Sequence, residues 1–290
     1  MDGGMDELLA THFAHLFIRD PLVVFSEDLE ELDLNKGDHF ENIQSTNWQH
    51  MRFKPPPSDK DDVGWRVEFR SMEIQITDFE NAAFSIFIVL ITRAILSFDL
   101  NFYISIQRTT ENMETAHARD AVLDRKFFFR KDPFPKRLPK HTPQQSASGS
   151  PFSSTTPSTV GTPPPSPPLG PVDTEYELMS ISDIINGCAD GSFPGLIPLV
   201  ESYLNSVNVD VETRCFLARY LDLIRKRADG TLWTGARWIR EFVAKHPSYK
   251  QDSVVSEEIC YDLVKAVEEV TVKEGQHGTV GWELLRGRKN

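Results

Sequence analysis

The chain of 290 residues lacks a surplus of positive charge: 31 lysines and arginines stand against 43 aspartates and glutamates, giving a net charge of −12. A general binder of nucleic acid needs a basic face for the phosphate backbone, so the composition predicts no nucleic-acid partner. A local basic pocket remains compatible with this total. The hydrophobic content of 40% is enough for one large domain or two smaller ones.

Cysteine is scarce. The three cysteines, Cys188, Cys215 and Cys260, are far apart and do not have the paired spacing of a zinc site. We therefore interpret them as reduced thiols whose default role is packing, which predicts a cytoplasmic location.

Long apolar runs are also lacking. The most apolar stretch runs from Ala82 to Thr92 and on to Phe98, and Arg93 interrupts it. This is shorter than the ~20 residues of a membrane span, so we expect a buried helix and no membrane partner. The acidic start of the chain has no apolar segment of the kind found in a secretory signal.

The common catalytic motifs are missing as well. The chain contains neither of the two usual glycine-rich nucleotide loops, no zinc-protease motif and no nucleophile elbow. His12 and His15 lie three residues apart in a predicted helix, a possible metal spacing, but no third ligand is nearby. Nucleotide or metal chemistry must therefore rest on other residues.

Hydrophobic periodicity predicts an α+β chain. We expect a helix from Glu7 to Ile18, an extended segment from Gly64 to Thr77, a buried helix capped by Asp78, and a polar amphipathic helix from Thr109 to Arg130. Further helices are predicted beyond residue 172, at Ser180 to Ile185, Phe193 to Tyr203, Asp210 to Ile224, Thr231 to Ala244 and Ser256 to Val272. Short turns between them suggest one packed helical layer.

A proline-rich insert divides the chain. Residues 132–172 hold twelve of the nineteen prolines and almost no aliphatic residues, so we predict that they are disordered. Five Ser/Thr-Pro steps there suit either a proline-directed phosphorylation target or a neutral insertion. The basic residues from Lys126 to Lys140 are either a solvated charge run or an anion or partner patch. The predicted organisation is a core over 1–131, this insert, a helical region over 173–275 that packs on the core, and a disordered tail over 276–290.

Glu68 and Arg70 are the strongest candidates for chemistry. Two residues apart in an extended segment, they share one face, while Val67 and Phe69 point to the other. Carboxylates suit Mg²⁺ and arginine suits a carboxylate or phosphate, so this face could hold a metal and an anionic substrate. Arg52 and Lys54 alternate in the same way. Spacing alone leaves open a solvated sheet face with cross-strand ion pairs.

Several long motifs then point to a family. They closely resemble the eukaryotic glutamate–cysteine ligase catalytic subunit. Before the insert they are His15 to Pro21, His39 to Arg52, Gly64 to Glu73, Thr77 to Ala82 and Glu111 to Met113. After it they are Met179 to Ile181, Phe193 to Pro198, Asp210 to Cys215 and His246 to Ser253. The resemblance covers nearly everything except the insert and roughly the last twenty residues.

The resemblance implies an enzyme that joins the γ-carboxylate of glutamate to the amine of cysteine, with ATP as co-substrate. The expected intermediate is γ-glutamyl phosphate, in the first step of glutathione synthesis. The implied fold is part of a glutamine-synthetase-like antiparallel sheet with a large helical C-terminal part. Magnesium ions would neutralise the phosphate oxygens.

Matched motif by motif, the resemblance makes Glu68 a magnesium ligand and Arg70 a substrate-contacting arginine. Trp48 matches a tryptophan that lines the amino-acid pocket. Arg52 and Lys54 are assigned to the phosphates of ATP by charge and position. Ser71 departs from the family pattern, which has proline there.

Only the C-terminal portion of the family's catalytic subunit is matched. The family's other metal-binding glutamates, and much of its nucleotide and substrate site, belong to an N-terminal half. We therefore expect this chain to be inactive alone, with a modifier subunit or a homodimer as a possible assembly. The alternative is a short non-catalytic protein that binds and modulates a full-length ligase subunit.

Overall fold

The computed structural model describes residues 4, 6–19, 26, 51–54, 56, 62–64, 66–73, 75–134 and 175–277. Trp48, most of the predicted insert and most of the predicted tail lie outside these residues. The described chain combines helices with two small antiparallel sheets, which agrees with the predicted α+β class. The larger glutamine-synthetase-like sheet stays a prediction.

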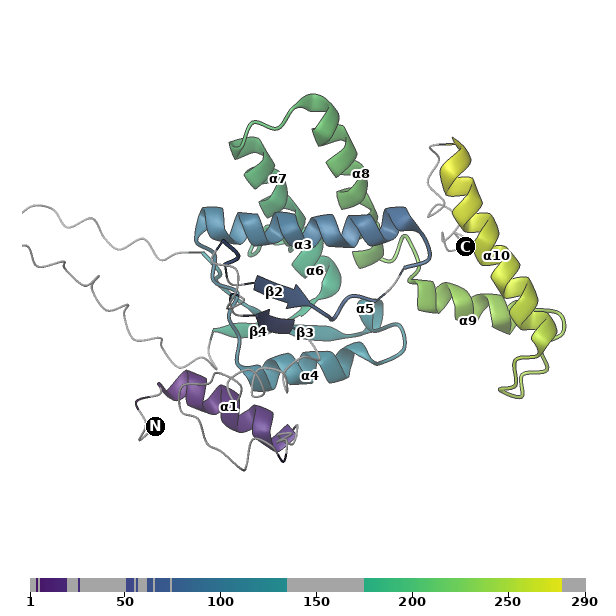
Figure 1. Cartoon of the computed structure of the whole chain (residues 1–290), viewed down its shortest axis with the longest axis horizontal. Coiled ribbons are helices and arrows are strands. Elements are labelled where there is room, and N and C mark those ends of the chain that lie inside the picture. Colours follow the sequence, from purple (N-terminus) through teal and green to yellow (C-terminus); the bar gives the residue numbers. More distant parts are fainter. Residues whose placement is uncertain are drawn as a thin grey trace, which may run out of the picture.

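Helix α3 (Asp78–Phe98) crosses the middle of the molecule (Figure 1). Its start is fixed by a capping box, in which Thr77 Oγ1 accepts from the backbone N–H of Glu80 while the Glu80 carboxylate accepts from that of Thr77. The predicted cap, Asp78, is wrong by one residue, because the hydroxyl of Thr77 takes that role. The helix ends at Asp99, which adopts a left-handed conformation.

The main core forms where α3 packs against α7 (Leu196–Ser206) and α8 (Val211–Ala228). Its buried members come from one face of each helix and from the turn after α8. They are Ala83, Phe87, Leu90, Ile91, Ala94, Ile197, Val200, Leu204, Leu221, Leu223, Ile224 and Leu232. Fully burying one large aliphatic side chain contributes about 1.5–3 kcal/mol, so this layer is the main source of stability.

The helix that the sequence predicts to be buried is confirmed on the face of α3 that packs against α7 and α8. On its other face Val89 and Leu96 are exposed. Among the described residues, α3 alone is long and apolar enough to cross a membrane, judged by length and composition. Core helices also have this length and composition, and one face of α3 is buried in the main core, as in such a helix.

The predicted helix from Thr109 to Arg130 is partly wrong. The segment divides into α4 (Ile106–Ala116), the short α5 (Ala121–Asp124) and strand β3 (Lys126–Arg130). Strand β3 pairs antiparallel with β4 (Tyr176–Ser180). Three consecutive phenylalanines favour a strand. Pairing with β4, which lies beyond the insert, makes this segment a strand despite its local helical pattern.

A second core cluster lies between this sheet and the short helix α6 (Ile181–Asn186). The rings of Phe102, Phe129 and Phe193 meet there, with centroid separations of 5.2 to 6.4 Å. This aromatic contact joins residues on both sides of the insert. The described region after the insert therefore packs on the described region before it.

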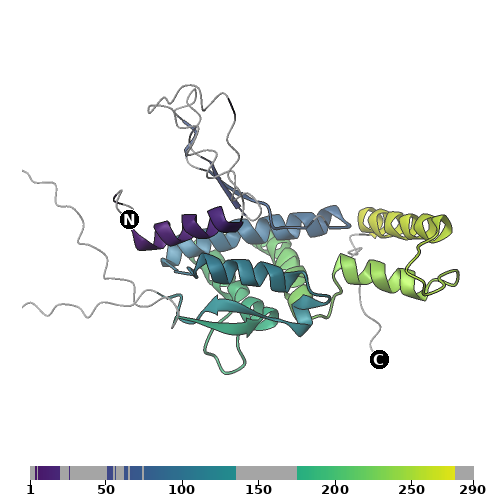
Figure 2. The ribbon, with the colours of Figure 1, turned by 90° about the horizontal axis from the view of Figure 1, so that it is seen from below.

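The remaining helices lie at the ends of the molecule. Helix α1 (Glu7–Arg19) lies beside α4, where His15 Nε2 is 3.0 Å from Thr110 Oγ1. Helices α9 (Gly235–Lys245) and α10 (Glu257–His277) pair side by side and extend away from the core (Figure 2). The predicted helices at both ends are confirmed, with bounds shifted by a few residues.

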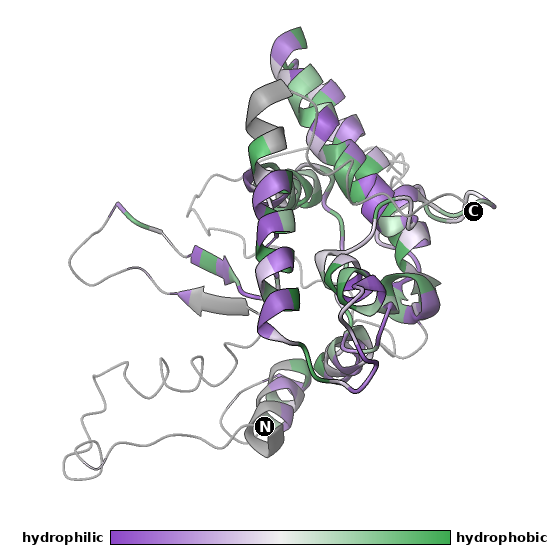
Figure 3. Ribbon diagram, turned by 90° about the vertical axis from the view of Figure 1, so that its right-hand side faces the viewer, coloured by the Kyte–Doolittle hydropathy of each residue, from purple (hydrophilic) through white to green (hydrophobic). Residues whose placement is uncertain are grey.

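Strands β1 (Met51–Lys54) and β2 (Arg66–Phe69) form the other antiparallel pair. They project from the helical body in two perpendicular views (Figures 2 and 3). The predicted extended segment is therefore a regular strand only to Phe69, and the described residues 70–73 and 75–77 have irregular backbone. This pair carries the site residues that the sequence predicts.

Candidate functional site

The β1–β2 register brings the predicted site residues together. Arg52 lies opposite Glu68, and Lys54 lies opposite Arg66. Directly opposite residues of an antiparallel pair share a face, so the register places charged positions of both strands on the same side. The side chain of Arg52 and the whole of Trp48 lie outside the described residues, and their predicted roles stay predictions.

Glu68 is held by two cations. The ammonium of Lys54 pairs with one carboxylate oxygen. Arg70 Nε lies 2.8 Å from the other. The predicted common face of Glu68 and Arg70 is thus confirmed, and Lys54 reaches the same carboxylate from the neighbouring strand. All three side chains are about one-third exposed, which leaves them open to a ligand.

The cations also control the charge of this carboxyl. The hydrogen bond from Lys54 lowers the pKa of Glu68 below its ordinary value, and the positive charges of Arg70 and Lys54 act in the same direction. Glu68 is therefore fully ionised near neutral pH, the state required of an oxygen ligand for a hard cation.

The magnesium site that the resemblance implies needs more ligands than this hairpin supplies. Mg²⁺ takes octahedral oxygen coordination, and Glu68 is a single carboxylate whose oxygens already contact two cations. The described part of the chain contains no group of three or more His, Cys, Asp or Glu that could hold a metal. Glu68 fits one position of such a site, and the remaining oxygen ligands, from water, substrate phosphate or other carboxylates, would come from outside this hairpin.

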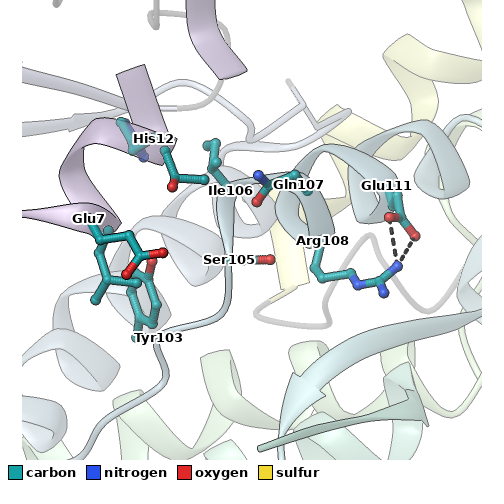
Figure 4. A pocket seen from close by; sticks show the side chains of 10 residues that line it. Glu7, His12, Tyr103, Ser105, Ile106, Gln107, Arg108 and Glu111 are labelled. Atoms are coloured by element: carbon teal, nitrogen blue, oxygen red, sulfur yellow. Dashed lines mark hydrogen bonds and ion pairs between the residues drawn. The ribbon is translucent and has the colours of Figure 1, made fainter. Parts of the chain in front are cut away.

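A cavity of about 430 Å³ separates α1 from α4 (Figure 4). Arg108, which lines the cavity, turns toward Glu111 and bonds both carboxylate oxygens at 2.7 and 2.9 Å. Arg108 Nε also donates to the Tyr176 hydroxyl, and the guanidinium lies over the Phe128 ring at 4.6 Å. Since these contacts tie α4 to the β3–β4 sheet, we interpret Arg108 as structural.

His12 lines this cavity, and His15 Nε2 lies 3.0 Å from Thr110 Oγ1.

Two structural features were not predicted from the sequence. The Asn112 side chain bonds both the N–H and the carbonyl of Phe128, at 2.7 and 2.9 Å, and so closes the free edge of β3. Arg227 on α8 pairs with the fully buried Glu80 on α3. Asn112 lies in the motif from Glu111 to Met113, and that motif was the signal in the sequence that could have identified it. No local signal identifies Arg227, because 147 residues separate it from its partner.

Comparison with known proteins gives a consistent result. A family model described as glutamate–cysteine ligase matches residues 1–270. The glutamate–cysteine ligase of Neurospora crassa is 68% identical over 289 residues, 94% of this chain and 39% of that protein. The human catalytic subunit is 52% identical over 261 residues, 90% of this chain and 38% of that protein.

The similarity extends to distant fungi and is spread along the chain. The glutamate–cysteine ligase of Saccharomyces cerevisiae is 39% identical over 287 residues, 94% of this chain and 37% of that protein. The chain thus spans about two fifths of the length of the relatives that it matches. Because the family model covers most of this sequence, the chain belongs to the glutamate–cysteine ligase family.

Proposed function

We propose that this chain forms part of an ATP-dependent ligase that joins the γ-carboxylate of glutamate to the amine of cysteine, through γ-glutamyl phosphate, in glutathione synthesis. The names of the relatives support this activity. The observation that carries the proposal is the ionised Glu68 held between Lys54 and Arg70 on an exposed strand pair.

Each of these side chains has a proposed role. Glu68 presents carboxylate oxygens to Mg²⁺, which when bound neutralises phosphate oxygens of ATP. Arg70 recognises a substrate carboxylate with its planar guanidinium, and Lys54 attracts phosphate as a point charge. Before the ligands bind, the two cations hold Glu68 in place and ionised. The roles of Arg52 in phosphate binding and of Trp48 in the amino-acid pocket are proposed from the resemblance.

The hairpin supplies one wall of this site. The chain spans only about two fifths of the length of its relatives and contributes one proposed metal ligand, so the chain alone is proposed to be inactive. Glutamate, cysteine and ATP are the proposed substrates, with a modifier subunit or a second copy as a proposed partner. The proposed location is the cytoplasm, which suits the three free cysteines.

The proposal is tested in a full-length ligase that contains this sequence. Glu68→Gln keeps the shape of the side chain but removes its charge, so ligation should fall by at least about 100-fold at ordinary Mg²⁺. Glu177→Gln, an exposed change on β4, is the matched control and should leave ligation unchanged. Circular dichroism should show the same fold in both variants. Full activity of Glu68→Gln would remove its proposed role.

Arg70→Lys tests substrate recognition separately. An ammonium keeps the charge but loses the planar fork, so the KM for an amino-acid substrate should rise about 10-fold. An unchanged KM for both amino acids would refute the assignment.

The second candidate function is a non-catalytic modulator of a full-length ligase. Exposed apolar side chains on α3 and α10, such as Leu96 and Val264, favour it because they provide an association surface. Adding the purified chain to a full-length ligase should then change its KM or its kcat. If the chain leaves both unchanged at saturating amounts, this candidate fails.

A further inference from the structure

A second cavity is lined by the connection from α4 to α5, the end of α8 and the start of α9. Its volume is about 430 Å³. Neither Glu68 nor Arg70 lines it, so it is separate from the hairpin face described above.

Positive charge dominates this cavity. Four arginines line it, Arg119, Arg227, Arg237 and Arg240, against two carboxylates, Glu73 and Asp120. The lining therefore carries two positive charges in excess, within a chain whose net charge is −12. A local concentration of guanidinium groups in a hollow is a recognition element for oxyanions.

Arg227 has hydrogen-bonding capacity to spare. Its side chain is only 7% exposed, and one terminal nitrogen pairs with Glu80. Its Nε and Nη1 atoms are buried and have no hydrogen-bond partner among the residues that the structure describes. Buried donors without a partner are costly and uncommon, so an arginine in a cavity wall with two of them indicates a missing acceptor.

Two further arginines are loosely held. Asp120 is the shared partner of Arg237 and Arg240, at 4.0 and 3.4 Å. These are long contacts, and the two guanidinium groups are about one-third and two-fifths exposed. Long, partly exposed ion pairs are weak, so an anion of higher charge can compete for both arginines.

The start of α9 adds backbone donors to the same place. Thr234 caps the helix by accepting from Arg237 N, and Thr234, Ala236 and Arg237 all line the cavity. The first N–H groups of a helix have no carbonyl within it to bond, and they lie at the positive end of its dipole. Helix starts of this kind bind phosphate, and here the start adjoins the underbonded Arg227.

Apart from His117, the rest of the lining is apolar. Leu123, Leu232 and the Trp233 ring face the cavity, and Arg237 lies over that ring at 5.0 Å. The wall therefore suits a ligand with a compact apolar or ring-shaped body beside its charged group.

We propose that this cavity binds a small phosphate monoester, whose phosphate contacts Arg227, Arg237, Arg240 and the start of α9 and whose body lies against Trp233. A phosphate fits better than a carboxylate because its three terminal oxygens can accept from several donors at once. The proposal rests on this cavity alone and stands whether or not the proposed ligase activity is correct.

Isothermal titration calorimetry on the full chain tests it, with phenyl phosphate and inorganic phosphate as probes and ionic strength held constant. Phenyl phosphate should bind saturably at one site, and more tightly than inorganic phosphate, because only phenyl phosphate contacts the indole. Binding that does not saturate, or that is equal for benzoate and phenyl phosphate, would overturn the proposal.

Variants locate the site. Arg237→Gln and Arg240→Gln should each weaken phenyl phosphate binding about 10-fold, because each removes a charged hydrogen bond. Arg219→Gln, on α8 but outside the cavity, is the matched control and should bind as the parent does. Equal binding in all three variants would place the ligand elsewhere.

Asp120→Asn provides a test in the opposite direction. Asp120 has a positive φ of 52°, which asparagine also adopts readily, so the backbone should tolerate the change. Removing the carboxylate frees Arg237 and Arg240, and phenyl phosphate should bind about 3-fold more tightly. A loss of affinity in this variant would contradict the proposed competition between Asp120 and the ligand.

Discussion

Among single residues, Glu80 has two structural roles. One carboxylate oxygen accepts from Thr77 N at 3.1 Å and from Thr77 Oγ1 at 3.3 Å, which begins α3. The other pairs with Arg227 and ties α3 to α8. The Glu80 side chain is fully buried and the Arg227 side chain is only 7% exposed, so each charge depends mainly on the other for compensation.

Glu80→Gln separates the two roles. Glutamine can still complete a capping box, but it leaves Arg227 as a buried charge without a counterion. The free energy of unfolding should fall by about 3 kcal/mol, measured by urea denaturation. Glu177→Gln on the exposed side of β4 should change it by less than about 0.5 kcal/mol. A loss as small as the control's would mean that the pair contributes no net stability.

Glu68 gives a prediction for pH. The hydrogen bond from Lys54, supported by the charges of Arg70 and Lys54, lowers the pKa of this carboxyl in the folded chain. Its ion pairs therefore stabilise the hairpin above the ordinary glutamate pKa of about 4.3. That contribution is lost as pH falls through the lower, folded value. Lys54→Met should move the pKa of Glu68 back toward the ordinary value, as followed by carboxyl ¹³C NMR, and an unmoved pKa would exclude Lys54 as the main cause.

Among the elements, the turn between α6 and α7 depends on two glycines packed against each other. Gly187 has φ +104°, and a Cβ there would lie 2.4 Å from the carbonyl oxygen of Pro194. Gly195 has φ +94°, and its Cβ would lie 2.4 Å from the backbone nitrogen of Gly187. Both contacts are with backbone, which cannot move aside without shifting the start of α7.

Gly187→Ala should therefore lower the free energy of unfolding by more than about 2 kcal/mol. Gly191→Ala is the matched control: it also has a positive φ, 77°, but its Cβ would meet open space. It should cost only the backbone strain, about 1 kcal/mol. Chemical denaturation of both variants checks the difference. Equal losses would show that the close approach of the two glycines is not limiting.

An element can be predicted from the sequence when the contacts that determine it are close along the chain, and it is missed when those contacts come from distant residues. The helix from Asp210 was predictable, since its cap is a local bond from Thr213 N to the Asp210 side chain at 2.9 Å. The shared face of Glu68 and Arg70 followed from the two-residue period of a strand. Strand β3 was missed because its partner β4 lies beyond the insert, and only that pairing opposes the local helical pattern.

At the scale of the whole molecule, the described chain leaves large apolar side chains in water. Leu96 on α3 is 77% exposed, and Tyr261 and Val264 on α10 are 60% and 66% exposed. Single exposed apolar residues are ordinary, but these lie on two long helices, and the chain spans only about two fifths of its relatives. We infer that these faces are contact surfaces in an assembly.

The isolated chain should therefore self-associate. Sedimentation velocity at micromolar concentration should show species larger than a monomer, because burying exposed leucine and valine releases about 25 cal/mol per Å² of apolar surface. Leu96→Gln combined with Val264→Gln should shift the distribution toward the monomer without unfolding either helix, since glutamine is a good helix former. Thr271→Gln, an exposed change on α10, is the control and should leave the distribution as it is. If the double variant associates as strongly as the parent, these two faces are not the contact, and the exposed strands of the β1–β2 hairpin become the next surface to test.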